Sequence, residues 1–501
     1  MRKVVLIGLD GASPKLIEEL IREGRLPNFR KIMEEGAFGT LRSTLPPLSA
    51  PAWASMFTGM SPGQHGVFDF LDRRLRPFSF IRLRGRAVWD IISLAGRKAI
   101  IVNVPFTYPP YKLSGLMISG PPCPGNKVFV WPPDELKNIK ELEEYYVPDL
   151  DVAPDYRGMD EVLFRRRAKN ITETRRRLVG ELMERQWDLF VAIFTTLDRV
   201  QHVYYGFSIK ESPLYDVVKR EYLVEYYNLM DKILETILSK LDGDTYLFVV
   251  SDHGFDYLVK FFGLYNALLS CSHVRSFKAR FYELTIGLLI EHSKLFKLAK
   301  LMSEFPRGRI TISTFNTLDA ICLTCSIFLK SKELRSIISR LTTCLPRLTD
   351  EGDSRIIDAV YRPQDLYAGS KLGKGPDLIV VPRQGYEPKA ILSKLVTPIR
   401  PCRGTYKTGA HVSFNARFGF FAALGDDIKS GARIDVDILS VAPTILHILD
   451  IPLPSYMHKE PLKGLFKPGS KLAERRTRKM SIKEVLRSRI RAVKGKMAQG
   501  S

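Results

Sequence analysis

The sequence predicts an α/β fold, doubly wound around a mostly parallel central sheet. Short apolar runs rich in β-branched residues recur along the chain, and each ends in a polar turn. Amphipathic helical patterns lie between these runs. Near-continuous apolar runs are typical of strands buried on both faces, as in parallel sheets covered by helices.

The expected elements alternate along the chain. The strands are expected at KVVLIGLD (3–10), KAIIVNVP (98–105), DLFVAIFTTLD (188–198), DTYLFVVSDHG (244–254), PDLIVVP (376–382) and FGFFAALG (418–425). The helices are expected at 13–24, 87–96, 215–241 and 438–450.

Residues 256–350 interrupt this alternation, because they are helix-rich, basic and hydrophobic. We interpret them as an inserted cap or substrate region. The core is then expected to comprise residues 1–255 and 351–465, and residues 466–501 form a basic helical tail. The segment 106–160, rich in Pro and Tyr, is expected to be a long surface excursion.

Positive charge is concentrated in a few places. The formal net charge is +22, and the tail from Lys467 holds twelve Lys or Arg against two Glu. Ser481 and Glu484 form a capping box that opens an amphipathic helix, which could dock on its own domain, on a partner or on an anionic membrane surface. Two further basic clusters lie at 73–86 and 165–177. Such patches suit phosphates, lipid head groups or nucleic acid.

The pattern of cysteines indicates whether the protein resides in a reducing or an oxidising compartment. The six of them are scattered without a framework, which is typical of a reducing compartment: Cys123, Cys271, Cys322, Cys325, Cys344 and Cys402. The lone CxxC at Cys322 and Cys325 is interpreted as core. With no export signal or membrane span in the sequence, the expectation is a cytoplasmic protein, with peripheral contact at the inner membrane face as an option for the tail.

Acidic and histidine residues follow three of the expected strands. The candidates are Asp10, then Asp198 with His202, then Asp252 with His253; His411 lies on a loop before the last strand. The carboxyl ends of parallel strands gather at one edge of a doubly wound sheet. Carboxylate and imidazole together are the ligands that zinc or manganese prefers. The pattern therefore predicts a divalent metal site.

Ser49, in the stretch PPLSAPAWASMFTG, has two interpretations. A serine before an Ala-rich run is commonly a helix cap. It would instead be a nucleophile if a base or a metal lowered the pKa of its hydroxyl. The local sequence leaves both open.

Taken in order, LIGLDGASP, LSAPAWASMFTGMSPGQHGV, TTLDRVQH, SDHGF and GAH resemble the motifs of the alkaline phosphatase superfamily. The resemblance is to the type I phosphodiesterase/nucleotide pyrophosphatase branch and its phosphohydrolase or phosphomutase relatives. It spans about residues 3–460 and includes VAPTILHILDIPLP, which is similar to the closing helix of that family.

The resemblance implies a site for two divalent ions, zinc or alternatively manganese. One ion would be held by Asp198, His202 and His411. The other would be held by Asp10, Asp252 and His253, together with the oxygen of Ser49. Ser49 takes the position of the nucleophile, so a covalent phosphoserine intermediate is implied.

One position departs from the family pattern. Where nucleotide-cleaving members place an Asn after the His-Gly pair, this chain has Asp69, an acid that would repel a phosphate. Lys260 is a candidate replacement donor to the substrate phosphate, and the arginines at 73–86 are others.

The leading hypothesis is a metal-dependent phosphodiesterase or phosphatase that acts on a phosphate ester through Ser49. A phosphomutase, or a transferase of phosphoglycan or phospholipid head groups, is the alternative on the same fold. A non-catalytic nucleic-acid-binding protein is a third, disfavoured because all seven candidate metal positions are intact. The natural substrate and the oligomeric state stay undetermined.

Overall fold

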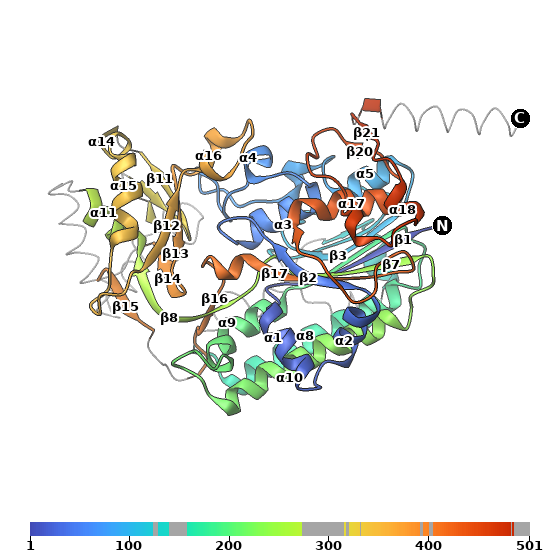
Figure 1. The fold of residues 1–501 in the computed structure, drawn as a ribbon, viewed down its shortest axis with the longest axis horizontal. Helices are drawn as coiled ribbons and strands as arrows, with labels where there is room; N and C mark the ends of the chain where they lie inside the picture. Colours follow the sequence, from blue (N-terminus) through green and yellow to red (C-terminus); the bar gives the residue numbers. More distant parts are fainter. Residues whose placement is uncertain are drawn as a thin grey trace, which may run out of the picture.

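A large mixed sheet forms the centre of the molecule (Figure 1). The structure, a computed structural model, describes residues 1–123, 129–139, 158–272, 315–316, 320–330, 332–390, 394–399, 404–481 and 483–484. The strands run in the order β18-β2-β17-β7-β1-β6-β3-β4-β5, with β19 beside β2. Their bounds are β1 Lys3–Leu9, β2 Ala37–Arg42, β3 Ala99–Val104, β4 Gly115–Ser119, β5 Val130–Trp131, β6 Leu189–Phe194, β7 Thr245–Val250, β17 Phe418–Leu424, β18 Ala432–Arg433 and β19 Val436–Asp437.

The middle of this sheet is parallel, as predicted. β1 pairs in parallel with β6 on one side and β7 on the other, and β3 pairs in parallel with β6 and β4. Strand β17 is antiparallel to both β7 and β2. The register sets Leu9 opposite Phe194 and Gly8 opposite Val250, so the strands β6, β1 and β7 end side by side.

Helices cover both faces of the sheet, and β1 shows the reason. Val5 and Ile7 pack into one hydrophobic core, whereas Val4 and Leu6 pack into another on the opposite face. The first core is closed by α1 Pro14–Arg22, α2 Pro27–Glu35, α8 Glu161–Leu182, α9 Thr196–Ser208 and α10 Val217–Leu238. The second is closed by α3 Ser49–Thr58, α5 Val88–Leu94 and α17 Val441–Ile448. All four predicted helices are confirmed.

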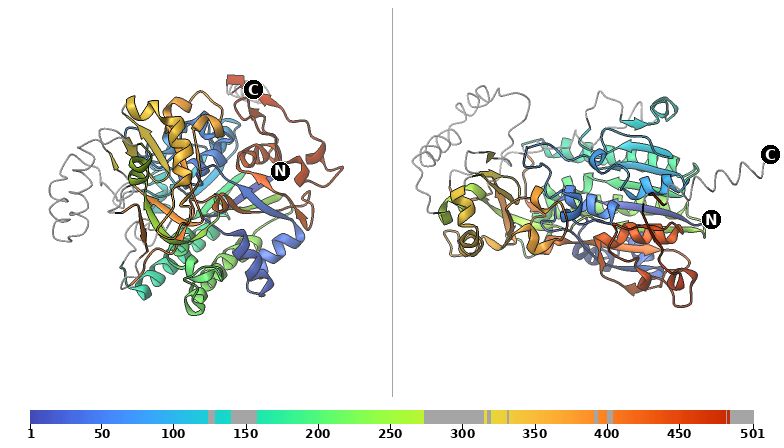
Figure 2. Two further views of the ribbon diagram at one scale, coloured as in Figure 1. Left: turned by 60° about the vertical axis from the view of Figure 1, so that its left-hand side comes forward. Right: turned by 90° about the horizontal axis from the view of Figure 1, so that it is seen from above.

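A second lobe lies at one end of the molecule, opposite the amino terminus (Figure 2). A five-stranded sheet in the order β12-β13-β11-β10-β9 forms part of it, and a four-stranded sheet contains β14, β8, β15 and β16. The bounds are β8 Asp256–Gly263, β9 Phe315–Asn316, β10 Ala320–Cys322, β11 Ser326–Leu329, β12 Ile357–Tyr361, β13 Leu378–Pro382, β14 Gly385–Lys389, β15 Val396–Pro398 and β16 Gly409–Ala410. Its helices include α11 Leu264–Ser272, α14 Lys332–Ser336, α15 Ile338–Cys344 and α16 Pro363–Leu366.

Two expectations about this lobe need correction. The run at 376–382 forms β13, which pairs antiparallel with β11 and β12 and is not a strand of the central sheet. An apolar run reports burial, and β13 is buried here by the separate hydrophobic core of the lobe. The described part of 256–350 contains strands as well as helices, and the sheets of the lobe include strands as far along the chain as Ala410. Residues 273–314 of the expected cap lie outside the described part.

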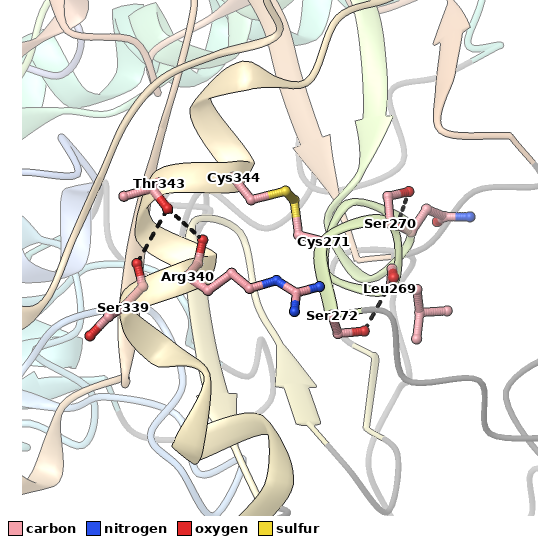
Figure 3. The surroundings of a disulfide bond; sticks show 9 residues. Leu269, Ser270, Cys271, Ser272, Ser339, Arg340, Thr343 and Cys344 are labelled. Atoms are coloured by element: carbon pink, nitrogen blue, oxygen red, sulfur yellow. Dashed lines mark hydrogen bonds between the residues drawn. A yellow bond between two sulfur atoms is a disulfide. The ribbon is translucent and has the colours of Figure 1, made fainter.

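The cysteine prediction was wrong for one pair. Cys271 of α11 and Cys344 of α15 form a disulfide, although 73 positions separate them in the sequence (Figure 3). Cys322 and Cys325 are free and buried, as predicted for core residues. Because this pair is bonded, the cysteines no longer support the expectation of a reducing compartment.

The first part of the tail packs on its own domain. Leu472 of α18 (Lys471–Glu474) is buried in the core beside α17, and β21 (Lys479–Met480) pairs with β20 (Leu453–Pro454). The predicted capping box is present, since the Ser481 hydroxyl accepts from the Glu484 amide. The amphipathic helix expected beyond it lies outside the described residues, so its contact with an anionic membrane stays a prediction.

Among the described residues, no helix combines the length and the apolar character that a membrane span requires.

Candidate metal centre

The predicted acidic and histidine residues meet where the central strands end. Asp10 directly follows β1, and Asp252 and His253 follow β7. Asp198 and His202 lie one turn apart on α9, which begins after β6. The fourth contribution, His411, directly follows β16, which pairs with β8 at the start of the second lobe. All six side chains are buried.

Close packing brings the His411 loop against α9. The Thr408 amide donates to the carbonyl of His202, and the Thr408 hydroxyl donates to that of Val203. Gly206 makes this approach possible, since a Cβ at that position would lie 2.4 Å from the Thr408 carbonyl oxygen. A glycine on α9 therefore sets the position of a histidine that is 205 residues away in the sequence.

Ser49 lies beside the same cluster. It is the first residue of α3, and its Oγ is 3.2 Å from Nε2 of His253. The cap of α3 is Leu48, which is extended and makes no side-chain cap bond, so Ser49 begins the helix without capping it. The first N–H groups of a helix lack intrahelical partners and favour anions. The hydroxyl therefore lies at a position suited to a phosphoryl group.

The ligand atoms fall into two groups. Asp198, His202 and His411 form one, and Asp10, Asp198 and His253 form the other, each with its atoms within 4.8 Å of one another. Asp198 belongs to both: its Oδ2 is 3.5 Å from His202 Nε2 and its Oδ1 is 3.6 Å from His411 Nε2. Asp252 adjoins the second group, with Oδ2 3.4 Å from His253 Nε2.

Three buried carboxylate oxygens in this cluster have no hydrogen-bond partner among the described residues: Asp10 Oδ1, Asp198 Oδ1 and Asp252 Oδ2. A buried, unpartnered carboxylate oxygen is costly unless a cation compensates it. Nδ1 of each histidine bonds a backbone carbonyl, that of Gly409 for His202, Gly254 for His253 and Pro47 for His411. This pattern fixes the tautomer that leaves Nε2 as the ligand atom. The residues therefore fit divalent ions.

Electrostatics agree with that fit. Burial, followed by the neighbouring carboxylates of Asp252 and Asp198, raises the pKa of Asp10 well above its usual range. Burial and Asp198 raise the pKa of Asp252 to about 7. Burial also lowers the pKa of His202 and of His411 well below 6.5, so both rings are neutral at neutral pH. Neutral imidazoles and mutually repelling carboxylates form a site that a cation stabilises.

The surrounding shell contains residues that the sequence did not single out. Trp53 Nε1 donates to Asp10 Oδ2 at 3.4 Å, from a position one turn after Ser49 on α3. Gln201 donates to the Gly11 carbonyl, and the Gly11 amide donates to Asp252. Gln201 is adjacent to His202 in the sequence, and this adjacency was the one sequence signal that could have identified it as a residue of the site. Such contacts orient the ligands.

Both tentative substrate residues have protein partners. The Lys260 ammonium on β8 forms an ion pair with Asp350 of the second lobe, which competes with binding to a phosphate. Asp69 is buried; its Oδ1 accepts from the Phe70 amide and its Oδ2 from the Ser326 hydroxyl. Asp69 therefore joins the loop after α4 (Pro62–His65) to β11, and its role in substrate binding stays a prediction.

Asp69 should make stability depend on pH. Burial raises the pKa of Asp69 to about 6 against 3.8 in the unfolded chain, so ionisation favours unfolding. This penalty is small near pH 4 and complete above about pH 7. The free energy of unfolding of Asp69→Asn, relative to wild type, should therefore be about 2 kcal/mol higher at pH 8 than at pH 4.5. Urea denaturation at both pH values measures it; a pH-independent difference would contradict it.

The fold is that of the alkaline phosphatase superfamily. The family model for type I phosphodiesterase/nucleotide pyrophosphatase matches residues 4–395, and the chain belongs to this family. It is thus a hydrolase that acts on phosphoric ester bonds.

Solved structures show the same fold. Murine ectonucleotide pyrophosphatase/phosphodiesterase 5 is similar with a TM-score of 0.54 and 12% identity, covering 93% of this chain and 100% of that one. An inactive form of the same murine protein in complex with AMP has a TM-score of 0.52 and 12% identity, covering 90% and 96%. A comparison with curated protein sequences finds no match.

Proposed function

We propose that the chain is a metal-dependent phosphodiesterase or phosphatase that works through a covalent phosphoserine at Ser49. One observation carries the proposal: the Ser49 hydroxyl begins a helix and lies 3.2 Å from His253, beside three buried carboxylate oxygens that have no hydrogen-bond partner in the described part of the chain. Ser49 is also partly exposed, unlike the other residues of α3, so a substrate can reach it.

The chain's own groups account for the order of events. The Ser49 hydroxyl gives up its proton to the solvent as Oγ attacks phosphorus, a new oxygen–phosphorus bond forms, and the ester oxygen leaves with the electron pair of the broken bond. The free N–H groups at the start of α3 then face the phosphoryl oxygens on Ser49. A water molecule attacks the phosphoserine, releases the phosphate product and restores the hydroxyl.

Asp198, His202 and His411 would hold one divalent ion, and Asp10, Asp252 and His253 would hold the second, with Asp198 close enough to contact both. Bound ions would lower the pKa of the attacking hydroxyl and offset charge on the phosphoryl and leaving oxygens. The mixture of carboxylate and imidazole favours zinc, with manganese as the alternative.

Removal and return of metal tests the proposal. Dialysis against a chelator should abolish hydrolysis of bis-p-nitrophenyl and p-nitrophenyl phosphate, and zinc or manganese should restore it. Elemental analysis should find about two ions per active chain. Full hydrolysis by a chain shown to be metal-free would overturn the proposal.

The AMP bound to the murine neighbour supports a nucleotide ester as a third assay substrate. A p-nitrophenyl ester of AMP tests whether a nucleoside improves turnover. If kcat/KM for this ester is higher than for bis-p-nitrophenyl phosphate, nucleotide phosphodiesters are favoured as substrates. An equal kcat/KM would show that the enzyme does not recognise the nucleoside.

A further inference from the structure

A cavity of about 790 Å³ lies beside the loop that follows α4, and we call it the arginine cavity. Its walls come from residues 65–86, from Phe328 of β11, and from η4 (Leu372–Lys374) with its neighbour Lys371. Eight cationic side chains line it: Arg73, Arg74, Arg76, Arg82, Arg84, Arg86, Lys371 and Lys374. None of the seven candidate metal-site residues lines it.

Two acids line the cavity against these eight cations, Asp69 and Asp72, and the oxygens of Asp69 accept from the Phe70 amide and the Ser326 hydroxyl. Asp72 pairs with Arg76 at 2.8 Å and with Arg82 at 3.4 Å. Arg73 pairs with Asp377 at 2.9 Å. The other five cations of the cavity form no ion pair with any described residue: Arg74, Arg84, Arg86, Lys371 and Lys374.

A neighbouring cavity of about 770 Å³ shares Arg86 and Lys371 with the arginine cavity. There, Arg42 and Lys459 both pair with Asp437, at 2.8 and 3.4 Å. Arg417 lines this second cavity as well and forms no ion pair with any described residue, so positive charge is in excess in both cavities and on the boundary between them.

We propose that the arginine cavity binds a small molecule that carries two or three phosphate groups. A phosphate carries about 1.5 to 2 negative charges at pH 7, so the five unpaired cations match two or three of them. The guanidinium fork suits phosphate oxygens. The volume lies within the usual range for small-molecule sites, and Leu71, Phe78 and Phe328 supply an apolar wall for an organic group.

The test uses the full chain with Ser49→Ala, stripped of metal, so that the probe is neither hydrolysed nor held by bound ions. Inorganic tripolyphosphate is titrated by calorimetry at about 0.15 M ionic strength, where long-range attraction is screened. The carboxylates of the empty metal centre repel this probe. The experiment therefore succeeds or fails independently of the phosphoesterase proposal.

Two triple variants are compared in that background. One is Arg84→Ala with Arg86→Ala and Lys374→Ala. Its control, Arg166→Ala with Arg167→Ala and Lys169→Ala, removes the same charge from exposed positions on α8. The cavity variant should weaken tripolyphosphate binding by about tenfold or more, because charge-assisted contacts are lost, and the control should not.

Orthophosphate should bind the unaltered cavity at least about tenfold more weakly than tripolyphosphate, because it engages fewer cations. Equal weakening by both triple variants would show a net-charge effect and overturn the proposal. Equal affinity for the two probes, or no binding of tripolyphosphate at all, would overturn it as well. Circular dichroism of every variant establishes that each is folded.

Discussion

Ser49→Ala is expected to lower turnover of phosphate esters by at least about 10³-fold while leaving the fold and the bound metal in place. The side chain contributes little to packing, since it is partly exposed and, among the described residues, it hydrogen-bonds only to His253. The loss would come from the missing nucleophile. Stopped reactions of the wild-type chain, analysed by intact mass, should also show a phosphoryl adduct that the variant lacks.

A second serine provides the matched control for this variant. Ser470 caps α18 through the Ala473 amide, far from Ser49 in the sequence. Ser470→Ala should cost about 1 kcal/mol of stability and leave turnover unchanged. Ser49→Thr keeps a hydroxyl and should retain part of the activity. Near-normal turnover by Ser49→Ala with metal bound would exclude the covalent mechanism.

Asp198→Asn is expected to release both metal ions and to lose about as much turnover as Ser49→Ala. Asp198 is the residue common to both ligand groups, and its two oxygens face His202 and His411. An amide replaces one charged oxygen by a nitrogen that cannot act as a ligand. Metal affinity for both positions should therefore fall, as measured by elemental analysis after dialysis.

His202→Gln separates this shared role from simple loss of a ligand. His202 belongs to one group only, so this variant should lose one ion and keep the other. Asp242→Asn is the control for the amide change, because Asp242 is an exposed partner of Lys3 before β7. Retention of two ions by Asp198→Asn, or the same single loss as in His202→Gln, would contradict the shared role.

Much of the site follows from local patterns. Apolar runs located the strands β1, β6 and β7, and in a parallel sheet such strands end together. The sequence therefore predicts that Asp10, Asp198 and Asp252 converge. His202 followed as well, because one helical turn separates it from Asp198.

Contacts between distant segments were not predictable in the same way. Lys260 was a reasonable phosphate donor by charge, but its partner Asp350 is 90 residues away. The run at 376–382 has the same composition whichever sheet it joins. Its hydrophobic pattern therefore could not predict that it pairs with β11 and β12. The pairing of Cys271 with Cys344 depends likewise on how α11 packs on α15.

The amino-acid order was enough to establish the α/β class, the strand-end ligands and the serine at the start of a helix, because these depend on residues near one another in the chain. The folded structure was needed to show that Asp198 belongs to both ligand groups, that Gly206 admits the His411 loop, and that five cations of the arginine cavity form no ion pair with any described residue. Those features depend on distances between side chains from separate elements, which packing sets and sequence spacing does not record.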